Sequence, residues 1–260
     1  MLVKFISSVV LTWLLAACAS TQGISVKTHS DQRVVRLPIE VMQAGNLPAP
    51  TVLVMHGCGG VGLHHKAWAK RLTSWGYNAV IVDSFSARTR ANICVNARVV
   101  TPIQRAQDAH LVAKWVKSQV WSTQRVGVLG FSHGGVSVLM AVTSDGAQRY
   151  VGGSFIDSAV AYYPACVSSN PFASTKNMPL QIHIGRADDW TPAALCPTLV
   201  QLWGMSDNYF EYQGAFHGFD RSNTDRLVRG KGGMHVLRSD AQAAELAFIR
   251  TKAFFDATLR

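Results

Sequence analysis

The stretch Arg125–Val138 of the sequence, RVGVLGFSHGGVSV, decides how the chain folds. Residues 126–129 (VGVL) form a short β-branched apolar run, which predicts a buried strand. The chain then turns through residues 130–134 (GFSHG), and the apolar residues 136–142 predict a helix. A strand, a G-x-S-x-G turn and a helix in this order are the arrangement of a nucleophile elbow.

Ser132 is the candidate nucleophile of this turn. A serine on so tight a turn has strained backbone angles, so Gly130 and Gly134, two residues either side, must lack side chains. The turn lifts the Ser132 hydroxyl clear of the sheet, to the N-terminus of the helix, where free N–H groups favour developing negative charge. The alternative is a flexible Gly/Ser turn. A base, an acid and an oxyanion hole in the right order would argue against that alternative.

Length and composition predict one domain with a sizeable core. The chain has 260 residues, of which 48% are hydrophobic, and a formal net charge of +10. The basic residues are scattered singly, and no nucleic-acid-binding module is recognisable, so no nucleic-acid partner is expected. A basic surface fits a protein near anionic lipid or a site for acidic substrates, or is simply a solvated face.

The N-terminus predicts export. A lysine at position 4 precedes an apolar run over about residues 5–17, which is too short for a comfortable membrane span and fits a secretory signal peptide. The following Leu15-Ala16-Ala17-Cys18 resembles a bacterial lipobox, with Cys18 as the lipid-modified residue; an ordinary signal peptide is the alternative. Residues 18–30 are then a polar tether and residues 31–260 the folded domain. The expected location is the cell envelope on the periplasmic side, and Ala19 resembles the outer-membrane type more than the inner-membrane type.

Export changes the reading of the four remaining cysteines. In an oxidising compartment Cys58, Cys94, Cys166 and Cys196 can form two disulfides, with three pairings open. We favour Cys58–Cys94 and Cys166–Cys196, because each pair would join two loops at the same edge of the predicted sheet. Buried free thiols are the alternative. A zinc site is not expected, because the four are widely spaced and no CxxC occurs.

Strands alternate with helices along the rest of the chain. This alternation predicts an α/β fold with a mostly parallel central sheet and helices on both faces. The expected strands are residues 34–41, 51–56, 77–82, 126–129, 154–163, 180–185 and 208–212, and the expected helices are residues 66–75, 102–119, 136–142, 191–204 and 240–259.

A glycine-rich turn, His56 to Gly60 (HGCGG), follows the strand at residues 51–56. This is where α/β-hydrolases place half of the oxyanion hole. From position alone, the candidate donors are the backbone N–H groups of Cys58 and of His133, the residue after the candidate nucleophile. A purely structural turn is the alternative.

A candidate acid and a candidate base follow the elbow. Asp188 and Asp189 come just past the strand at residues 180–185, and we favour Asp188, because Asp189 can cap the helix that Pro192 helps to start. His217 is the favoured base over His235, which follows a glycine-rich run. The order Ser132, Asp188, His217 is the α/β-hydrolase order of nucleophile, acid and base. The imidazole would take the serine proton, and the carboxylate would fix its tautomer.

Arginines also follow a strand end. Arg88 and Arg90 lie in the loop at residues 84–101 and are candidates to bind a substrate carboxylate. The alternative is that they only make the surface soluble.

Together, HGCGG, GFSHGG, GRADDWTP and GAFHGFD resemble the dienelactone hydrolase family of α/β-hydrolases over about residues 34–258. The resemblance implies the α/β-hydrolase fold and a hydrolase without metal or organic cofactor. The founding members carry a cysteine nucleophile, whereas this chain has Ser132, and Cys58 lies in the oxyanion turn. We therefore expect a serine hydrolase of small carboxylic esters, lactones or thioesters. A peptidase or acyltransferase on the same triad and a non-catalytic binding protein are the alternatives. The loop at residues 84–101 is the longest candidate lid, so a fairly open site is expected.

Overall fold

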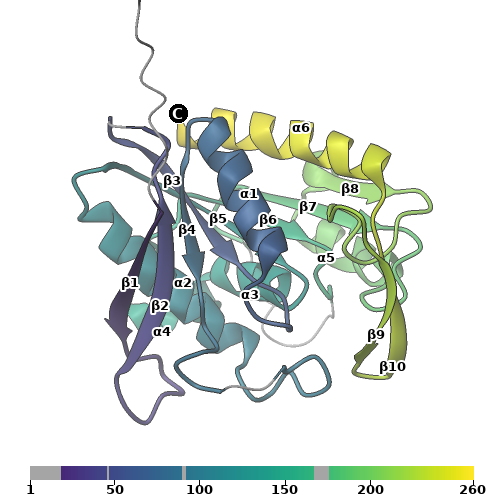
Figure 1. Cartoon of the computed structure of the whole chain (residues 1–260), viewed down its shortest axis with the longest axis horizontal. Helices are drawn as coiled ribbons and strands as arrows, with labels where there is room; N and C mark the ends of the chain where they lie inside the picture. The colour runs from purple at the N-terminus through teal and green to yellow at the C-terminus, as the bar shows by residue number, and fades with distance from the viewer. Residues whose placement is uncertain (1–18, 46, 90–91, 167–175) are drawn as a thin grey trace, which may run out of the picture.

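The elbow strand lies in the middle of an eight-stranded sheet with the order β1-β2-β4-β3-β5-β6-β7-β8 (Figure 1). The structure, a computed structural model, describes residues 19–45, 47–89, 92–166 and 176–260. Strands β3 to β8 run parallel, and β2 is antiparallel to its neighbours β1 and β4, which confirms the predicted mostly parallel sheet. The strands are β1 (Ala19–Val26), β2 (Val35–Met42), β3 (Ala49–Met55), β4 (Asn78–Val82), β5 (Ser122–Phe131), β6 (Ser158–Tyr162), β7 (Leu180–Gly185) and β8 (Tyr209–Tyr212).

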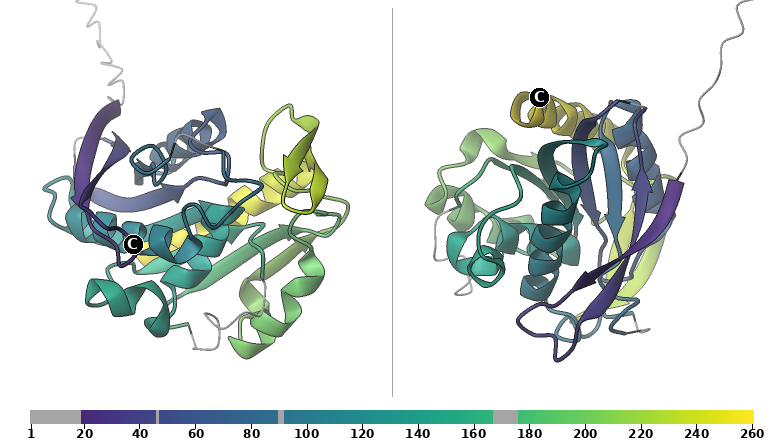
Figure 2. Two further views of the ribbon diagram at one scale, coloured as in Figure 1. Left: turned by 90° about the horizontal axis from the view of Figure 1, so that it is seen from below. Right: turned by 90° about the vertical axis from the view of Figure 1, so that its left-hand side faces the viewer.

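Helices cover both faces of this sheet (Figures 1 and 2). They are α1 (Leu63–Ser74), α2 (Pro102–Lys117), α3 (His133–Ala141), the short α4 (Arg149–Val151), α5 (Pro197–Leu202) and α6 (Ala241–Leu259). Helices α1 and α6 pack on one face, and α2 and α3 on the other. At Gly127 of β5, a Cβ would lie 2.9 Å from the Phe255 and Leu259 side chains of α6, so this glycine allows the helix to approach closely.

The central strands are buried on both faces. All five residues of β4 (NAVIV) and all six of β7 (LQIHIG) are buried, as expected for parallel strands between two helix layers. Side-chain caps begin the helices on either side of the sheet. Thr101 accepts a hydrogen bond from the Gln104 N–H at the start of α2, and Asp240 accepts one from the Ala243 N–H at the start of α6. No helix among the described residues is both long and apolar enough to cross a membrane.

The predicted tether over residues 18–30 is wrong for most of its length. Residues 19–26 form β1, which pairs with β2 from Ala19 opposite Met42 to Val26 opposite Val35 (Figure 2). The segment was expected to be a tether because it is polar. It still forms a strand because an edge strand needs backbone hydrogen bonds to its neighbour and only a partly apolar inner face. The signal-peptide residues and Cys18 lie outside the described residues.

A hairpin that the sequence reading did not predict follows the end of the main sheet. Its strands are β9 (Asp225–Gly230) and β10 (Gly233–Arg238), and they form a separate two-stranded sheet. The base of the hairpin is closed, because the Ser239 N–H donates to the Thr224 carbonyl at 2.7 Å. The helix expected at residues 191–204 is also interrupted: a 3₁₀ turn at Ala193–Leu195 precedes the shorter α5.

Candidate active site

The elbow between β5 and α3 has the strained backbone that its sequence predicts. Ser132 has φ 55° and ψ −117°, a conformation that residues other than glycine rarely adopt. A Cβ on Gly130 would lie 2.3 Å from the Gly134 carbonyl O, and a Cβ on Gly134 would lie 2.3 Å from the Met55 carbonyl O. Backbone atoms therefore exclude a side chain at both positions, and Ser132 stands at the N-terminus of α3.

His217 forms a buried pair with Asp188. Its Nδ1 lies 2.8 Å from Oδ2 of Asp188, and since a carboxylate accepts, the imidazole carries its proton on Nδ1 and keeps Nε2 as the basic atom. Asp188 also accepts from the N–H groups of Trp190 and Thr191 and from the Thr191 hydroxyl. Burial raises the pKa of Asp188, but the His217 charge and these hydrogen bonds outweigh it and hold the pKa below the usual value of 3.8.

Asp189 and His235 have other partners than the His217–Asp188 pair. The Asp189 carboxylate accepts from the Val236 N–H at 3.1 Å, and His235 stacks on the Trp190 ring with 5.0 Å between centroids. Asp188 thus pairs with His217, whereas Asp189 is hydrogen-bonded to the backbone of β10. The helix-capping role considered for Asp189 is not observed.

Tyr163 supports the imidazole from one side. Its ring centroid lies 4.5 Å from that of His217, and its hydroxyl donates to Oδ1 of Asp220 at 2.8 Å. The other oxygen of Asp220 accepts from Trp68 and pairs with His64. Burial raises the pKa of Asp220, but the His64 charge and these hydrogen bonds hold it well below the usual value. Asp220 belongs to the GAFHGFD stretch, but the sequence alone gave it no role.

The glycine-rich turn after β3 is held at three consecutive carbonyls. The His56 carbonyl accepts from Arg105 at 2.5 Å, the Gly57 carbonyl pairs with Nδ1 of His56 at 2.7 Å, and the Cys58 carbonyl accepts from the Ile93 N–H at 3.1 Å. In a trans peptide the N–H points away from the C=O. The held Gly57 carbonyl therefore fixes the direction of the Cys58 N–H. The turn lies close to the candidate nucleophile, because a Cβ placed on Gly57 would lie 3.6 Å from the Ser132 Cβ.

The second candidate donor is oriented by the helix itself. The Ser132 carbonyl accepts the Val136 N–H at 2.9 Å as part of the first turn of α3. Because that carbonyl shares a peptide plane with the His133 N–H, the N–H points out of the helix N-terminus. Both candidate oxyanion donors thus have a fixed direction before any substrate binds.

Two disulfides are present, in the pairing that the sequence analysis favours: Cys58–Cys94 and Cys166–Cys196. The first joins the glycine-rich turn after β3 to the loop after β4. Cys94 in turn accepts a hydrogen bond at its carbonyl from the Lys231 N–H, at the tip of the β9–β10 hairpin. This disulfide therefore connects three walls of the site.

A cavity of about 400 Å³ opens at Ser132 and His217. Its walls include the glycine-rich turn after β3, Trp190, and residues of the unpredicted hairpin, Arg226, Val228 and Leu237. Arg221 adds a second positive charge, and none of the described residues that line the cavity is Asp or Glu. The sequence does carry a signal for the hairpin, because apolar pairs at 227–228 and 236–237 flank the turn residues GKGG.

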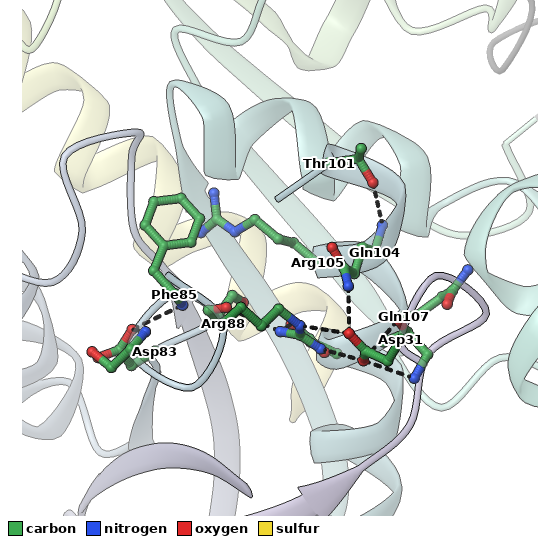
Figure 3. Close-up of polar contacts among 12 residues, drawn as sticks. Asp31, Asp83, Phe85, Arg88, Thr101, Gln104, Arg105 and Gln107 are labelled. Carbon is green, nitrogen blue, oxygen red and sulfur yellow. Dashed lines mark hydrogen bonds and ion pairs between the residues drawn. The ribbon is translucent and has the colours of Figure 1, made fainter. Parts of the chain in front are cut away.

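Arg88, a substrate-binding candidate in the sequence, is not among the described residues that line the cavity at Ser132 and His217. Its guanidinium is buried and pairs with Asp31 at 2.7 Å (Figure 3). It also pairs with Asp108 at 2.8 Å. Gln104 also donates to Asp31 at 2.6 Å. This network ties the segment after β1 to α2 and the loop after β4. Arg90, the other candidate, lies outside the described residues.

Comparisons with known proteins show which proteins this chain resembles. The probable 2-oxo-3-(5-oxofuran-2-ylidene)propanoate lactonase of a Bradyrhizobium species is 24% identical over 212 residues, which are 75% of this chain and 82% of that protein. The carboxymethylenebutenolidase of Pseudomonas putida is 21% identical over 225 residues, 80% of this chain and 89% of that protein.

The fold has solved counterparts. The structure of Thermogutta terrifontis esterase 2 phosphorylated by paraoxon has a TM-score of 0.66 and 15% identity, and the match covers 91% of this chain and 94% of that one. The fold is thus the predicted α/β-hydrolase fold. The model of the dienelactone hydrolase family matches residues 39–259. The match spans strands β3 to β8, the elbow and the buried His217–Asp188 pair, and the chain therefore belongs to the dienelactone hydrolase family of hydrolases.

Proposed function

We propose that the chain is a serine hydrolase that cleaves small carboxylic esters, lactones or thioesters through an acyl-enzyme intermediate. Ser132 is the nucleophile, His217 the general base and acid, and Asp188 the residue that fixes the imidazole tautomer. The backbone N–H groups of Cys58 and His133 form the oxyanion hole. The contact that carries this proposal is the 2.8 Å pair of His217 and Asp188 in the cavity that Ser132 lines.

The steps follow from these groups. The Ser132 oxygen attacks the carbonyl carbon while Nε2 of His217 takes the hydroxyl proton, and the carbonyl oxygen becomes an anion between the two N–H groups. The imidazolium then gives its proton to the leaving oxygen or sulfur, which departs and leaves the acyl group on Ser132. A water molecule, activated by the neutral imidazole, hydrolyses the acyl-enzyme and restores the serine.

The cavity narrows the substrate class. A volume of about 400 Å³ suits small acyl groups, and Arg221 and Arg226 favour a substrate that carries a negative charge. The variant Arg226→Gln should raise the KM for an anionic ester about 10-fold and leave the KM for a neutral ester of the same size unchanged.

The triad is tested with p-nitrophenyl esters of increasing acyl length and with a fluorophosphonate probe. Wild-type protein should prefer short chains and be labelled, whereas Ser132→Ala should be neither active nor labelled. The variants Asp188→Asn and His217→Ala should also lose hydrolysis. A wild type that is labelled but inactive on esters would point to another acyl substrate, such as a peptide. A wild type that is neither labelled nor active would refute the serine hydrolase and favour a binding protein.

We also propose that the chain is exported and lipid-anchored at Cys18. Two disulfides support export, because disulfides persist in oxidising compartments. Since β1 begins at Ala19, a lipid on Cys18 would hold the edge of the sheet against the membrane without a spacer. Incorporation of a labelled fatty acid into the wild type but not into Cys18→Ser would support the anchor, and equal labelling of both would contradict it.

A further inference from the structure

Arg105 connects the two segments that carry the proposed oxyanion donors. It projects from α2, its side chain is completely buried, and its guanidinium lies 4.9 Å from the Phe85 ring centroid (Figure 3). One of its NH₂ groups donates to the His56 carbonyl at 2.5 Å, and the other contacts Nδ1 of His133 at 2.7 Å. His56 is the residue before Gly57-Cys58, and His133 is the residue after the nucleophile.

The contact with His133 defines the state of that imidazole. Arginine only donates, so Nδ1 of His133 must accept, and the ring proton is on Nε2, which faces the Ala97 carbonyl at 3.4 Å. Burial lowers the pKa of His133 to about 3, and the Arg105 charge acts in the same direction. The imidazole therefore stays neutral and keeps accepting from Arg105 across the pH range in which a serine hydrolase works.

Fold stability alone explains this arginine poorly. Among the described residues, no carboxylate oxygen lies within 4.0 Å of its nitrogens, and its Nε has no hydrogen-bond partner. Arg88, by contrast, is also buried but is paired with two carboxylates. A buried charge without an ion pair is costly, and apolar replacements of similar volume are often neutral or stabilising. The hydrogen bonds that Arg105 makes both end on the oxyanion segments.

We propose that Arg105 is a positioning residue for the oxyanion hole. It holds the peptide next to the Cys58 donor and the residue that provides the other donor in one fixed arrangement. Its positive charge, held in a surrounding of low polarity, also favours the anion that forms on the substrate oxygen. This inference rests on the proposed function, because it assumes that Cys58 and His133 bind that oxygen.

The test compares Arg105→Gln and Arg105→Lys with the matched control Arg88→Gln, which removes another buried arginine that contacts neither oxyanion segment. Loss of one oxyanion donor lowers kcat by about 10²–10³-fold in serine hydrolases. Misalignment of both donors should lower kcat at least about 10-fold, with KM within about 3-fold of wild type. Lysine should restore only part of the loss, because one ammonium cannot span both acceptors. Arg88→Gln should lower the melting temperature and keep kcat.

A second variant covers the case in which the Arg105 variants do not fold. His133→Leu removes the acceptor of Arg105 but keeps the backbone N–H, and it should lower kcat several-fold. When both variants fold, the double variant Arg105→Gln/His133→Leu should lose less activity than the product of the two single losses, because both changes break the same contact.

Two outcomes separate the inference from the proposed function. If the wild type hydrolyses esters and folded Arg105→Gln keeps the wild-type kcat, whatever its melting temperature, the inference is overturned and the function stands. If the Arg105 variants do not fold, a wild-type kcat in folded His133→Leu also overturns the inference. If the wild type neither hydrolyses nor is labelled, the function fails and the inference fails with it.

Discussion

The two disulfides offer a controlled test of how the oxyanion turn is held. Cys58–Cys94 links residues 36 apart in the sequence and Cys166–Cys196 links residues 30 apart, so both close loops of similar length. Only the first touches the oxyanion turn. We compare Cys94→Ala with Cys196→Ala, since each breaks one bond and leaves both proposed oxyanion residues unchanged.

The expected loss of stability is nearly the same for the two variants. In the loop-entropy model, closed loops of 36 and 30 residues stabilise the fold by about 3.8 and about 3.6 kcal/mol. For a domain of this size, that corresponds to a fall in melting temperature of roughly 7–15 °C in each variant. Stability therefore cannot distinguish the two variants, and any difference in turnover must come from the position of the bond.

Turnover should differ. Without the bond to Cys94, the glycine-rich turn keeps its backbone hydrogen bonds but loses its covalent link to the loop after β4, which walls the site and is hydrogen-bonded to the hairpin. A displacement of about 1 Å in a catalytic group can lower the rate by about 10²-fold, so loosening of the turn should lower kcat by roughly 10-fold. Ester hydrolysis is measured at a temperature at which both variants are folded by circular dichroism. Equal kcat values for Cys94→Ala and Cys196→Ala would refute the reasoning.

Three further predictions follow from the same geometry. Asp188→Asn should lower the kcat of ester hydrolysis by about 10⁴-fold, because the amide cannot hold His217 in its Nδ1–H tautomer. The control Asp189→Asn should change kcat less than about 3-fold. The reverse ranking would make Asp189 the acid. Gly134→Ala should unfold the protein or lower its melting temperature sharply, because its Cβ would lie 2.3 Å from the Met55 carbonyl O. The control Gly45→Ala, with no atom within 4 Å of its Cβ, should have the melting temperature of wild type in thermal denaturation. A wild-type melting temperature for Gly134→Ala would contradict the elbow geometry. Burial raises the pKa of Asp31, but Arg88 and Thr28 outweigh it and lower the pKa from 3.8 to about 2. The Asp31 carboxylate therefore stabilises the fold above about pH 4, and this contribution is lost as the pH falls towards 2. Urea unfolding of wild type and Asp31→Asn should give a stability difference at pH 5 that shrinks by pH 2.5, and a constant difference would rule out this titration.

The features that the sequence predicted well are local or follow from chain order. The G-x-S-x-G turn needs only its own glycines, and the order Ser132, Asp188, His217 places three groups at the carboxyl ends of parallel strands. The two disulfide pairings also needed only the expectation that neighbouring strands end at one edge of the sheet. The preference for Asp188 rested on a helix cap by Asp189, and the structure pairs Asp188 with His217 without that cap.

The features that were missed depend on distant partners. The polar segment at residues 19–26 is a strand only because β2 offers it an edge. Arg88 and Arg105 both look like surface residues in the sequence. In the structure both are buried: Arg88 pairs with Asp31 and Asp108, and Arg105 binds the His56 carbonyl and His133. No local sequence pattern shows which distant residue a buried arginine pairs with, so the sequence alone could not place these two side chains.

The closed base of the β9–β10 hairpin has a consequence for how substrate selectivity can change. Thr224 and Ser239 are joined by a hydrogen bond at the neck, and Leu237 and Arg238 run beside His217, so the neck belongs to the fixed frame of the site. The outer part, residues 226–235, supplies Arg226 and Val228 to the cavity wall. Insertions, deletions or exchanges there should reshape the entrance, because Ser132, Asp188 and His217 are held by the main sheet and not by this outer part. Grafting another loop between residues 226 and 235, with Lys231 and His235 kept for their contacts to Cys94 and Trp190, should therefore change which substrates fit the cavity.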